Sequence, residues 1–219
     1  ESIHIRKGTI NLNEVSLNRF IKAIGDKKVR EIDIEDIDNF IKHPLTQKLA
    51  SSTINIDLRS IKVFMVWLKT RNHIEKIPVI GQIPVEKQEP IYLTNAEFKT
   101  ICNRVDPHFQ RAFYFYRETG LRLSEPFIGE IDGEFLKVSA EKSKTRKNHK
   151  FYIDPELMAI LKEMRSMMDE KIKRNIATLE NAIDYYSKVF RKACKRNGLE
   201  PVKNRKFHSL RHTFAVREY

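Results

Sequence analysis

The pattern of apolar and polar positions predicts helices in the first third of the chain. Between Leu12 and Ile24 the apolar residues fall roughly on one helical face, and Gly25 ends the run. The apolar positions of this segment are Leu12, Val15, Leu17, Phe20, Ile21 and Ile24. Such a face predicts an amphipathic helix that packs against its neighbours.

Two further helices are predicted in the same region. Asp33 can cap the first of them, with Asp36 three positions later in an approximate capping box, and Pro44 stops it. Its apolar positions are Ile34, Ile37, Phe40 and Ile41. The second begins at Ser51 or Ser52, and its apolar residues alternate steps of four and three. These are Ile54, Leu58, Ile61, Met65 and Leu68. The region is therefore predicted to be a small all-α bundle.

A proline-rich strip from Ile77 to Pro90 interrupts the helical pattern. Its prolines break any helix and favour extended backbone, so we interpret the strip as an interdomain linker. A long loop inside one domain is the alternative. The predicted boundaries are residues 1–82 for the helical domain, 83–91 for the linker and 92–219 for a second domain.

The region after the strip has a mixed pattern. Thr94 and Thr178 are predicted to cap two of its helices, Phe109–Thr119 and Pro155–Arg174 are predicted to form two more, and a last segment begins near Phe207. Two strands are predicted, Glu134–Lys144 and His149–Asp154, around a basic turn, with Val138, Phe151 and Ile153 as core side chains. The predicted fold class is therefore mainly α with a small β-hairpin (α+β).

Charge and cysteine content narrow the classes of partner and site. The 219 residues carry 41 Lys and Arg against 29 Asp and Glu, a net charge of +12, which favours nucleic acid, or next an anionic membrane surface, as partner. Cys102 and Cys194 form no CxxC pair, which argues against a zinc or disulfide framework.

The apolar runs and the start of the chain predict the cellular location of the protein. The longest apolar run, Val63–Leu68, is far too short for a membrane span, and no signal peptide is visible, so we expect a cytoplasmic protein. The first residue is Glu1 rather than Met, which suggests a processed or cut chain.

The HSLRHTFA string that starts at His208 carries the first candidate chemistry. On a helix, His208, Arg211 and His212 share one face because they are spaced at i, i+3 and i+4. A guanidinium between two imidazoles repels a metal cation but can bind a phosphate through two parallel hydrogen bonds, and histidines transfer protons near neutral pH. The alternatives are a zinc site, which lacks the glutamate of an HExxH arrangement, and a buried histidine pair without chemistry.

The TGLRLSE string from Thr119 to Glu125 carries the second set of candidate functional residues. Gly120 permits a tight turn and places Arg122 at a helix start, where backbone N–H groups favour an anion. Glu125 lies within reach to orient Arg122 or to cap the helix. The alternative is an ordinary surface ion pair between Arg122 and Glu125. Pro126, directly after this string, is expected to shorten the helix.

The chain resembles the tyrosine recombinase (phage integrase) family in three strings that occur in this order: TGLRLSE, a lysine-rich hairpin and HSLRHTFA. The first region resembles that family's core-binding domain in EIDIEDIDNFI and STINIDLRSIKVFMVWL, and the segment from Tyr92 to Phe98 fits the start of its second domain. The resemblance covers nearly the whole chain. It implies an N-terminal SAM-like helical core-binding domain followed by a tyrosine-recombinase catalytic domain.

The resemblance implies a role for each matching residue. Arg122 and Arg211 match two catalytic arginines that stabilise charge on the scissile phosphate in the transition state. His208 matches the general acid/base residue, and His212 matches a supporting position. Glu125 is expected to orient Arg122.

A hairpin lysine is implied to protonate the departing 5′ oxygen. We favour Lys144, because the Lys-Thr pair at the end of the first strand matches the family's placement. Lys142, on the same face of the strand two residues earlier, is the alternative. The implied reaction is DNA cleavage and rejoining through a 3′-phosphotyrosine link, with a free 5′ hydroxyl, and it needs no cofactor or metal.

The chain departs from the family after Arg211. It has neither an LGH-like string nor the nucleophilic tyrosine, and Tyr219, its last residue, is not nominated. Tyr185 and Tyr186 are expected to pack the helix that they sit on. We therefore expect a site-specific integrase or recombinase that, as this chain alone, lacks activity.

Two alternatives remain at this point. One is a catalytically incomplete fragment that binds DNA without cleaving it, or takes a tyrosine from another chain. The other is a basic metal-dependent nuclease, against which the absence of a carboxylate cluster near the histidines argues.

The expected partner is double-stranded DNA. Candidate contacts from the hairpin are Arg146, Lys147, His149 and Lys150, and those from the helical bundle are Arg59 and Lys62. An ordinary solvated face is the alternative for the last two. The resemblance implies a homo-tetramer on paired DNA sites for the full-length protein, and no membrane partner is expected.

Overall fold

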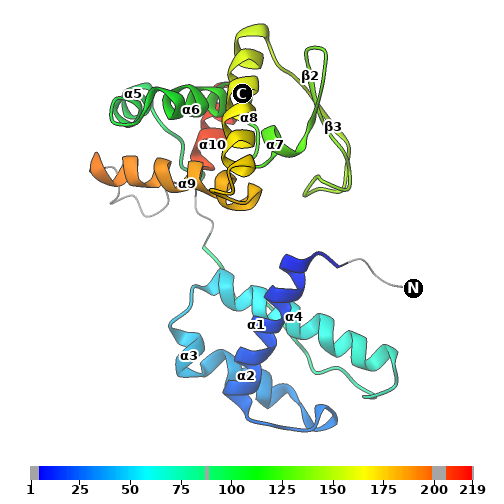
Figure 1. The fold of residues 1–219 in the computed structure, drawn as a ribbon. Helices are drawn as coiled ribbons and strands as arrows, with labels where there is room; N and C mark the ends of the chain where they lie inside the picture. The colour runs from blue at the N-terminus through cyan, green and yellow to red at the C-terminus, as the bar shows by residue number, and fades with distance from the viewer. Residues whose placement is uncertain (1–4, 87–88, 199–205, 219) are drawn as a thin grey trace. The chain divides into compact units, whose positions relative to one another are not determined.

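The computed structural model describes residues 5–86, 89–198 and 206–218. The chain divides into two compact units, Glu1–Gln88 and Glu89–Tyr219. The first is helical, and the second combines helices with a three-stranded antiparallel sheet (Figure 1).

The first unit is built on two long helices, α1 and α4, that pack against each other (Figure 1). Its elements are α1 (Lys7–Ile24), η1 (Val29–Glu31), α2 (Ile34–Lys42), α3 (Pro44–Gln47) and α4 (Ser51–Thr70). The capping box is confirmed, because the Asp33 side chain accepts from the Asp36 amide and the Asp36 side chain accepts from the Asp33 amide. The prediction for α4 is also confirmed, since its five stripe residues are all buried.

The predicted apolar face of α1 is wrong in part. Phe20 is buried, whereas Leu12, Val15 and Ile21 are each about half exposed. Polar contacts set the orientation of α1 instead, because Ser16 donates to the buried Asp57 of α4 at 2.8 Å and Arg19 also pairs with that carboxylate. A buried carboxylate must keep its hydrogen-bond partners, so α1 turns its polar side to α4. In α2, Ile34 is likewise exposed.

The first half of the proline-rich strip belongs to the first unit and is no free linker. Ile77, Ile80 and Ile83 pack against the core of that unit. The Asn55 side chain donates to the Ile83 carbonyl and accepts from the Ile83 amide, both at 2.9 Å. This pairing replaces the backbone partner that a sheet would supply. Lys87 and Gln88 of the predicted linker lie outside the described residues.

The second unit surrounds the apolar helix α6 with other helices and a sheet. Its elements are α5 (Asn95–Cys102), α6 (Pro107–Thr119), α7 (Glu125–Ile128), β1 (Glu130–Asp132), β2 (Phe135–Val138), β3 (His149–Tyr152), α8 (Pro155–Lys173), α9 (Leu179–Arg196) and α10 (Ser209–Glu218). The predicted caps are confirmed, since the side chains of Thr94 and Thr178 accept from backbone amides of the first turns of α5 and α9.

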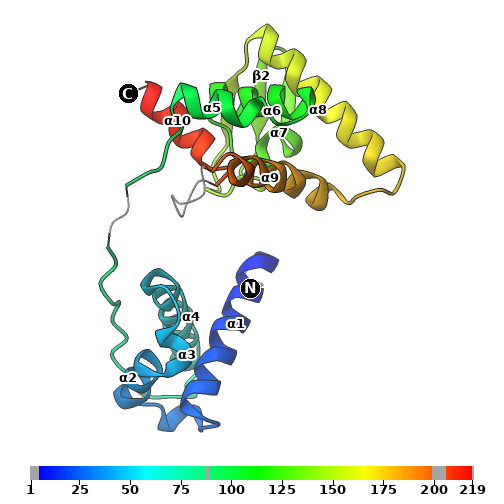
Figure 2. The same ribbon diagram turned by 90° about the vertical axis from the view of Figure 1, so that its left-hand side faces the viewer.

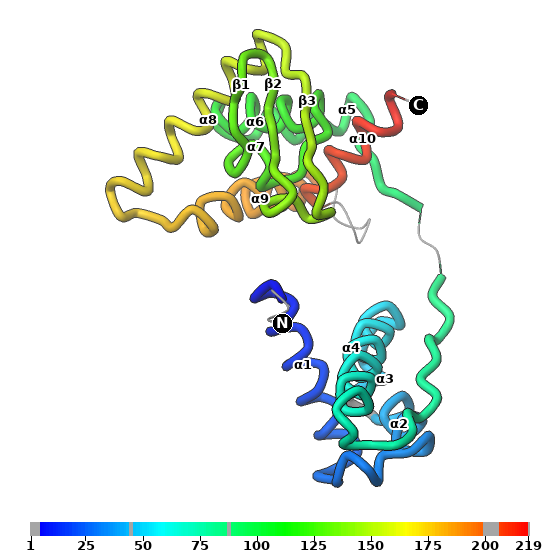
Figure 3. The backbone as a smooth tube through the Cα atoms, turned by 90° about the vertical axis from the view of Figure 1, so that its right-hand side faces the viewer, coloured from blue at the N-terminus to red at the C-terminus, as the bar shows by residue number. Residues whose placement is uncertain are grey.

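The sheet differs from the prediction of two long strands. It has three short strands in the order β1-β2-β3, with Val138 paired to His149 (Figure 3). β2 ends at Val138, because the polar residues that follow offer no alternating apolar face, and residues 139–148 form successive turns. The prediction that Lys142 and Lys144 share a strand face is therefore wrong, because both lie in these turns.

Aromatic side chains of α6 fill the core of the second unit. Phe113, Phe115 and Tyr116 are fully buried, while Tyr114 is 38% exposed. Phe207 enters the same core from the far end of the chain, with its ring edge-on to those of Tyr116, Phe113 and Phe190. Next to this anchor, α10 packs along α6 (Figure 2).

Neither a membrane-spanning helix nor a metal cluster is found within residues 5–86, 89–198 and 206–218. Within those ranges, no helix combines the length and the apolar character that crossing a membrane requires. Among the same residues, no three His, Cys, Asp or Glu side chains lie together in a way that could hold a metal ion. Cys102 and Cys194 are not joined in a disulfide.

Candidate active site

The site begins at the turn that follows α6. Gly120 ends this helix in the left-handed region, with φ at +61°. A Cβ at this position would lie 2.4 Å from a ring carbon of Phe214 on α10. Glycine is therefore required twice here, for the backbone conformation and for the close approach of α10.

Arg122 is held in that turn by Glu125. The Arg122 backbone amide donates to one Glu125 carboxylate oxygen and its guanidinium donates to the other, both at 2.7 Å. Glu125 is only 2% exposed, so this is no ordinary surface pair. Contrary to the prediction, Arg122 precedes the short helix α7 and its backbone amide is already bonded to Glu125, so this amide is not free for an anion.

A buried hydroxyl holds the same turn from the core. The Tyr116 hydroxyl donates to the Leu123 carbonyl at 2.6 Å. Complete burial raises the pKa of Tyr116 well above its usual value, so this group stays a hydrogen-bond donor. The backbone is thereby held at two neighbouring points, at the Arg122 amide by Glu125 and at the Leu123 carbonyl by Tyr116.

The HSLRHTFA string joins the same place from α10. The anchored Phe207 directly precedes His208, which lies in the turn before the helix. One turn later, the Arg211 guanidinium donates to the Gly120 carbonyl at 2.6 Å. The second arginine therefore bonds to the turn that carries the first, which brings together residues about ninety positions apart.

Charges around His208 define the electrostatics of the site. Partial loss of hydration lowers the pKa of His208, and the nearby charges of His212, Arg211, Arg122 and Lys144 lower it further. The His208 and His212 rings lie edge to face with centroids 4.7 Å apart. Burial and the charge of Arg122 also lower the pKa of Arg211, which nevertheless keeps its proton at neutral pH.

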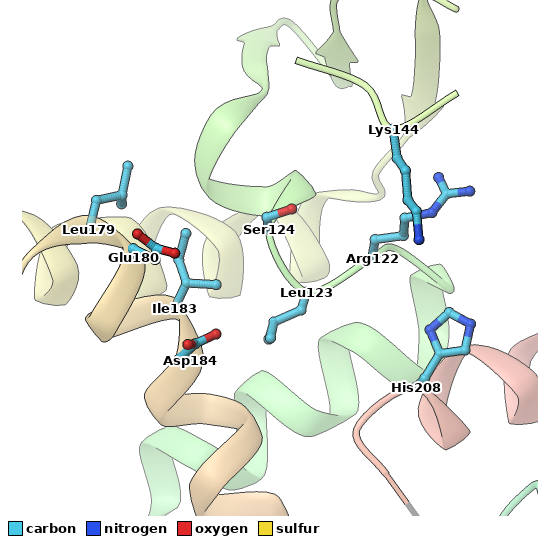
Figure 4. A pocket seen from close by; sticks show the side chains of 9 residues that line it. All are labelled: Arg122, Leu123, Ser124, Lys144, Leu179, Glu180, Ile183, Asp184 and His208. Atoms are coloured by element: carbon cyan, nitrogen blue, oxygen red, sulfur yellow. The ribbon is translucent and has the colours of Figure 1, made fainter. Parts of the chain in front are cut away.

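The first pocket of the site, here called the cationic pocket, has a volume of about 490 Å³. Its lining residues are Arg122, Leu123, Ser124, Lys144, Leu179, Glu180, Ile183, Asp184 and His208. Figure 4 shows Arg122, Lys144 and His208 gathered on one side and the α9 residues on the other. The pocket thus has a cationic side and a side that is apolar and acidic.

A neighbouring pocket of about 240 Å³ shares His208 with the first. It is lined by Leu121, Leu123, Ser187, Lys206, Phe207, His208 and Arg211. Arg211 therefore faces this neighbouring pocket, next to the cationic pocket, and His208 lies at the boundary between them.

The other candidate residues lie apart from the cationic pocket. Lys142, His149 and Lys150 line a different cavity of about 390 Å³. The Lys150 ammonium sits 3.8 Å from the centre of the Phe135 ring. Arg146 and Lys147 are exposed on the turn between β2 and β3.

In the first unit, the two candidate cations lie on the outer side of α4. Arg59 and Lys62 are both exposed. The Nε of Arg59 donates to the Asn55 carbonyl of its own helix at 3.2 Å.

Sequence reasoning missed residues that line both pockets. Lys206 adds a cation beside Arg211, and its position two residues before His208 was a usable signal. Glu180, Ile183 and Asp184 lie far from Arg122 in sequence, and no local pattern points from α9 to the pocket.

This arrangement can bind a phosphate diester and move protons on it. Two guanidiniums and an ammonium supply positive charge, and hydrogen bonds within the protein hold both guanidiniums. An imidazole with a lowered pKa is neutral at pH 7 and can accept a proton.

No protein-family model and no curated sequence matches the chain. Among solved structures, it is similar to a lambda integrase dimer bound to a COC′ core site, with a TM-score of 0.73, 16% identity, and coverage of 98% of this chain and 80% of that one. It is also similar to a lambda integrase tetramer bound to a Holliday junction (TM-score 0.69, 18% identity, 98% and 68% coverage).

A third similar structure is the Tn1549 transposon integrase in complex with transposon right end DNA (TM-score 0.70, 17% identity, 98% and 82% coverage). In another lambda integrase dimer, the chain spans 65% of the length, slightly under two thirds. The expected resemblance to the tyrosine recombinase fold is confirmed over 98% of the chain. At these identities the likeness shows the fold alone.

Proposed function

We propose that this chain acts in site-specific DNA recombination, cleaving and rejoining DNA through a 3′-phosphotyrosine intermediate. The observation that carries the proposal is the grouping of Arg122, Lys144 and His208 around one pocket, with Arg211 bonded to the Gly120 carbonyl beside it. Preorganised cations of this kind act on charge that develops in a transition state.

Each residue has a defined part in the proposed reaction. A tyrosine oxygen attacks the scissile phosphorus while His208 accepts the hydroxyl proton. Arg122 and Arg211 stabilise the charge on the non-bridging oxygens. Lys144 gives a proton to the departing 5′ oxygen, and the reverse steps rejoin the strand.

Two further residues support these groups. Glu125 holds Arg122 through two hydrogen bonds, and the His212 ring packs edge-on against His208. Lys144 is preferred to Lys142 as the proton donor, because Lys142 lines a different cavity from Arg122 and His208.

The proposal requires a tyrosine from elsewhere. No tyrosine among the described residues lines the cationic or the neighbouring pocket. Tyr186 is buried and bonds to His108 at 2.9 Å, while Tyr185 contacts the Phe109 ring. Tyr219 lies outside the described residues. The attacking side chain would therefore come from an undescribed part of the protein or from another chain.

The proposed partner is double-stranded DNA, bound by both the helical domain and the catalytic domain. The similar lambda integrase structures contain a dimer on a core site and a tetramer on a Holliday junction. By analogy we propose a homo-tetramer on paired DNA sites for the complete protein. The reaction as proposed uses no metal ion.

Trapping of a covalent protein–DNA adduct tests the proposal. The chain, together with any sequence that follows Tyr219 in its reading frame, is incubated with nicked duplexes from the flanks of its coding region. We expect a 3′-linked adduct that forms in the presence of a chelator, and loss of the adduct in Arg122→Ala.

Two outcomes would point elsewhere. Cleavage that stops when chelator is added, and leaves no protein-linked 3′ end, would support a metal-dependent nuclease. Salt-dependent DNA binding with no adduct, even when a tyrosine-containing chain is mixed in, would leave a protein that binds DNA without cleaving it.

A further inference from the structure

Lys144 lies in the turns between β2 and β3, and side-chain hydrogen bonds hold these turns together. The Val138–His149 strand pair closes their base, and the Ala140 amide donates to the Asn148 side chain at 2.7 Å. Arg146 has φ at +55°, a left-handed conformation that a non-glycine residue adopts only when its surroundings hold it there.

Thr145 lies at the centre of this set. Its hydroxyl is 2.9 Å from the hydroxyl of Ser143, a fully buried residue, and 2.7 Å from Nε2 of His149. Its amide also donates to the Ser143 hydroxyl at 3.2 Å. The residue directly after Lys144 is thus tied both to the buried side of the turn and to the first residue of β3.

His149 is itself held by the sheet. Its ring stacks nearly parallel to that of Phe151, with centroids 5.9 Å apart, and its backbone belongs to β3. Its Nε2 is bonded to the Thr145 hydroxyl. The imidazole therefore gives Thr145 a fixed point of attachment on the sheet.

We propose that Thr145 and His149 are positioning residues, which clamp the turn so that Lys144 reaches the cationic pocket beside Arg122 and His208. This inference rests on the proposed function of that pocket. Without the clamp, the Lys144 side chain would sample a wider range of positions. The pocket would then lose a cation that is in place before DNA binds.

Amide hydrogen exchange in the free protein tests the clamp itself. Thr145→Val keeps the branched shape of the side chain and removes only the hydroxyl. We expect exchange of the 140–146 amides to accelerate by about 5-fold to 150-fold, the range for loss of both hydrogen bonds of that hydroxyl. Thr145→Ser should restore slow exchange. Thr100→Val is the matched control, since the Thr100 hydroxyl bonds within α5.

A double-mutant cycle tests whether the clamp acts through Lys144. Affinity for a short DNA duplex at low salt is measured for Thr145→Val, Lys144→Ala and the double variant. We expect each single change to weaken binding several-fold, and Thr145→Val to add nothing once Lys144 is absent. A merely structural role for Thr145 would weaken binding equally in both backgrounds.

The outcomes separate the clamp from the function of the pocket. Unchanged exchange in Thr145→Val, with weaker binding in Lys144→Ala, would overturn the clamp and leave the pocket's function standing. Faster exchange in Thr145→Val, with unchanged binding in Lys144→Ala, would overturn the positioning role together with the part proposed for Lys144.

Discussion

The two units present positive charge in opposite ways. On α4 of the first unit, Arg59 and Lys62 are exposed and reach into solvent. In the second unit, Arg122 and Arg211 are partly buried, and each guanidinium donates to a fixed oxygen, of Glu125 and of Gly120 respectively. The first unit therefore offers solvent-exposed charge, with Arg59 bonded through Nε to its own helix, and the second offers partly buried charge beside the pockets.

This difference separates the electrostatic attraction of a polyanion from the chemistry on a bound phosphate. Exposed cations release counterions from a polyanion, and their effect falls as salt rises. Cations held by internal hydrogen bonds need little rearrangement when charge develops on a bound phosphate, so their effect appears in the rate of reaction. Under the proposed function, the same residue type therefore has different roles in the two units.

Removal of Arg211 should give the largest effect. In the protein that carries its nucleophile, Arg211→Ala should lower the rate of adduct formation by about 100-fold to 1000-fold, while DNA affinity stays within about tenfold. Arg59→Ala, measured in parallel, should lower affinity and leave the rate at saturating DNA unchanged. Equal effects on rate from the two variants would erase the contrast between the units.

The close contact at Gly120 predicts the next largest effect. Gly120→Ala should destabilise the protein by about 2–5 kcal/mol, from about 1–2 for the left-handed backbone and about 1–3 for overlap with Phe214. Gly133→Ala is the control, since Gly133 has φ at +59° with open space around it, and should cost only the first part. Denaturant unfolding measures both, and similar losses would argue against the contact.

The lowered pKa of His208 predicts a pH-dependent affinity. His208 is neutral at pH 7 in the free protein, and a bound phosphate would raise its pKa by favouring the charged ring. Binding then takes up a proton, so DNA affinity should rise about threefold to tenfold as pH falls from about 7 to about 5.5. The other groups that face the ring, Arg122, Lys144, Arg211 and His212, are present both in the wild type and in the His208→Asn variant that tests this prediction.

Fluorescence titration at several pH values checks this expectation. His208→Asn should flatten the pH dependence, whereas His73→Asn, which changes a histidine of the first unit, should preserve it. An affinity that rises equally with falling pH in both variants would assign the proton to another group.

The smallest effect belongs to the exposed cations. Arg59→Ala and Lys62→Ala should each weaken DNA binding a few-fold and lower the slope of log affinity against log salt by about 0.9. Lys162→Ala on α8 is the matched exposed control. An unchanged slope would remove these two residues from the proposed DNA interface.

The sequence predicted best what a single stretch of chain decides. The α4 stripe, the Asp33 capping box and the turn at Gly120 depend on local periodicity and local hydrogen bonds, and all three were correct. The grouping of His208 with His212 was equally accessible, because helical spacing alone brings the two rings together.

The sequence failed where distant residues decide. The buried Asp57 orients α1 differently from its apolar pattern, and no residue near Ser16 in the sequence indicates that Ser16 bonds to Asp57. In the same way, Asp184 reaches the cationic pocket only because α9 packs in the second unit, and the Arg211–Gly120 bond joins two remote strings. Tertiary contacts of this kind leave no periodic trace in a single sequence.

The Asn55–Ile83 pairing limits how far apart the two units can act. Ile83 is fixed to the first unit by Asn55, and the Leu93 amide is fixed to the second by the Thr213 hydroxyl at 2.9 Å. The ten steps between residues 83 and 93 span at most about 36 Å when fully extended. That reach is roughly one turn of B-DNA. If both units bind DNA as proposed, a tether of this length gives each unit a high effective concentration near DNA that the other already holds.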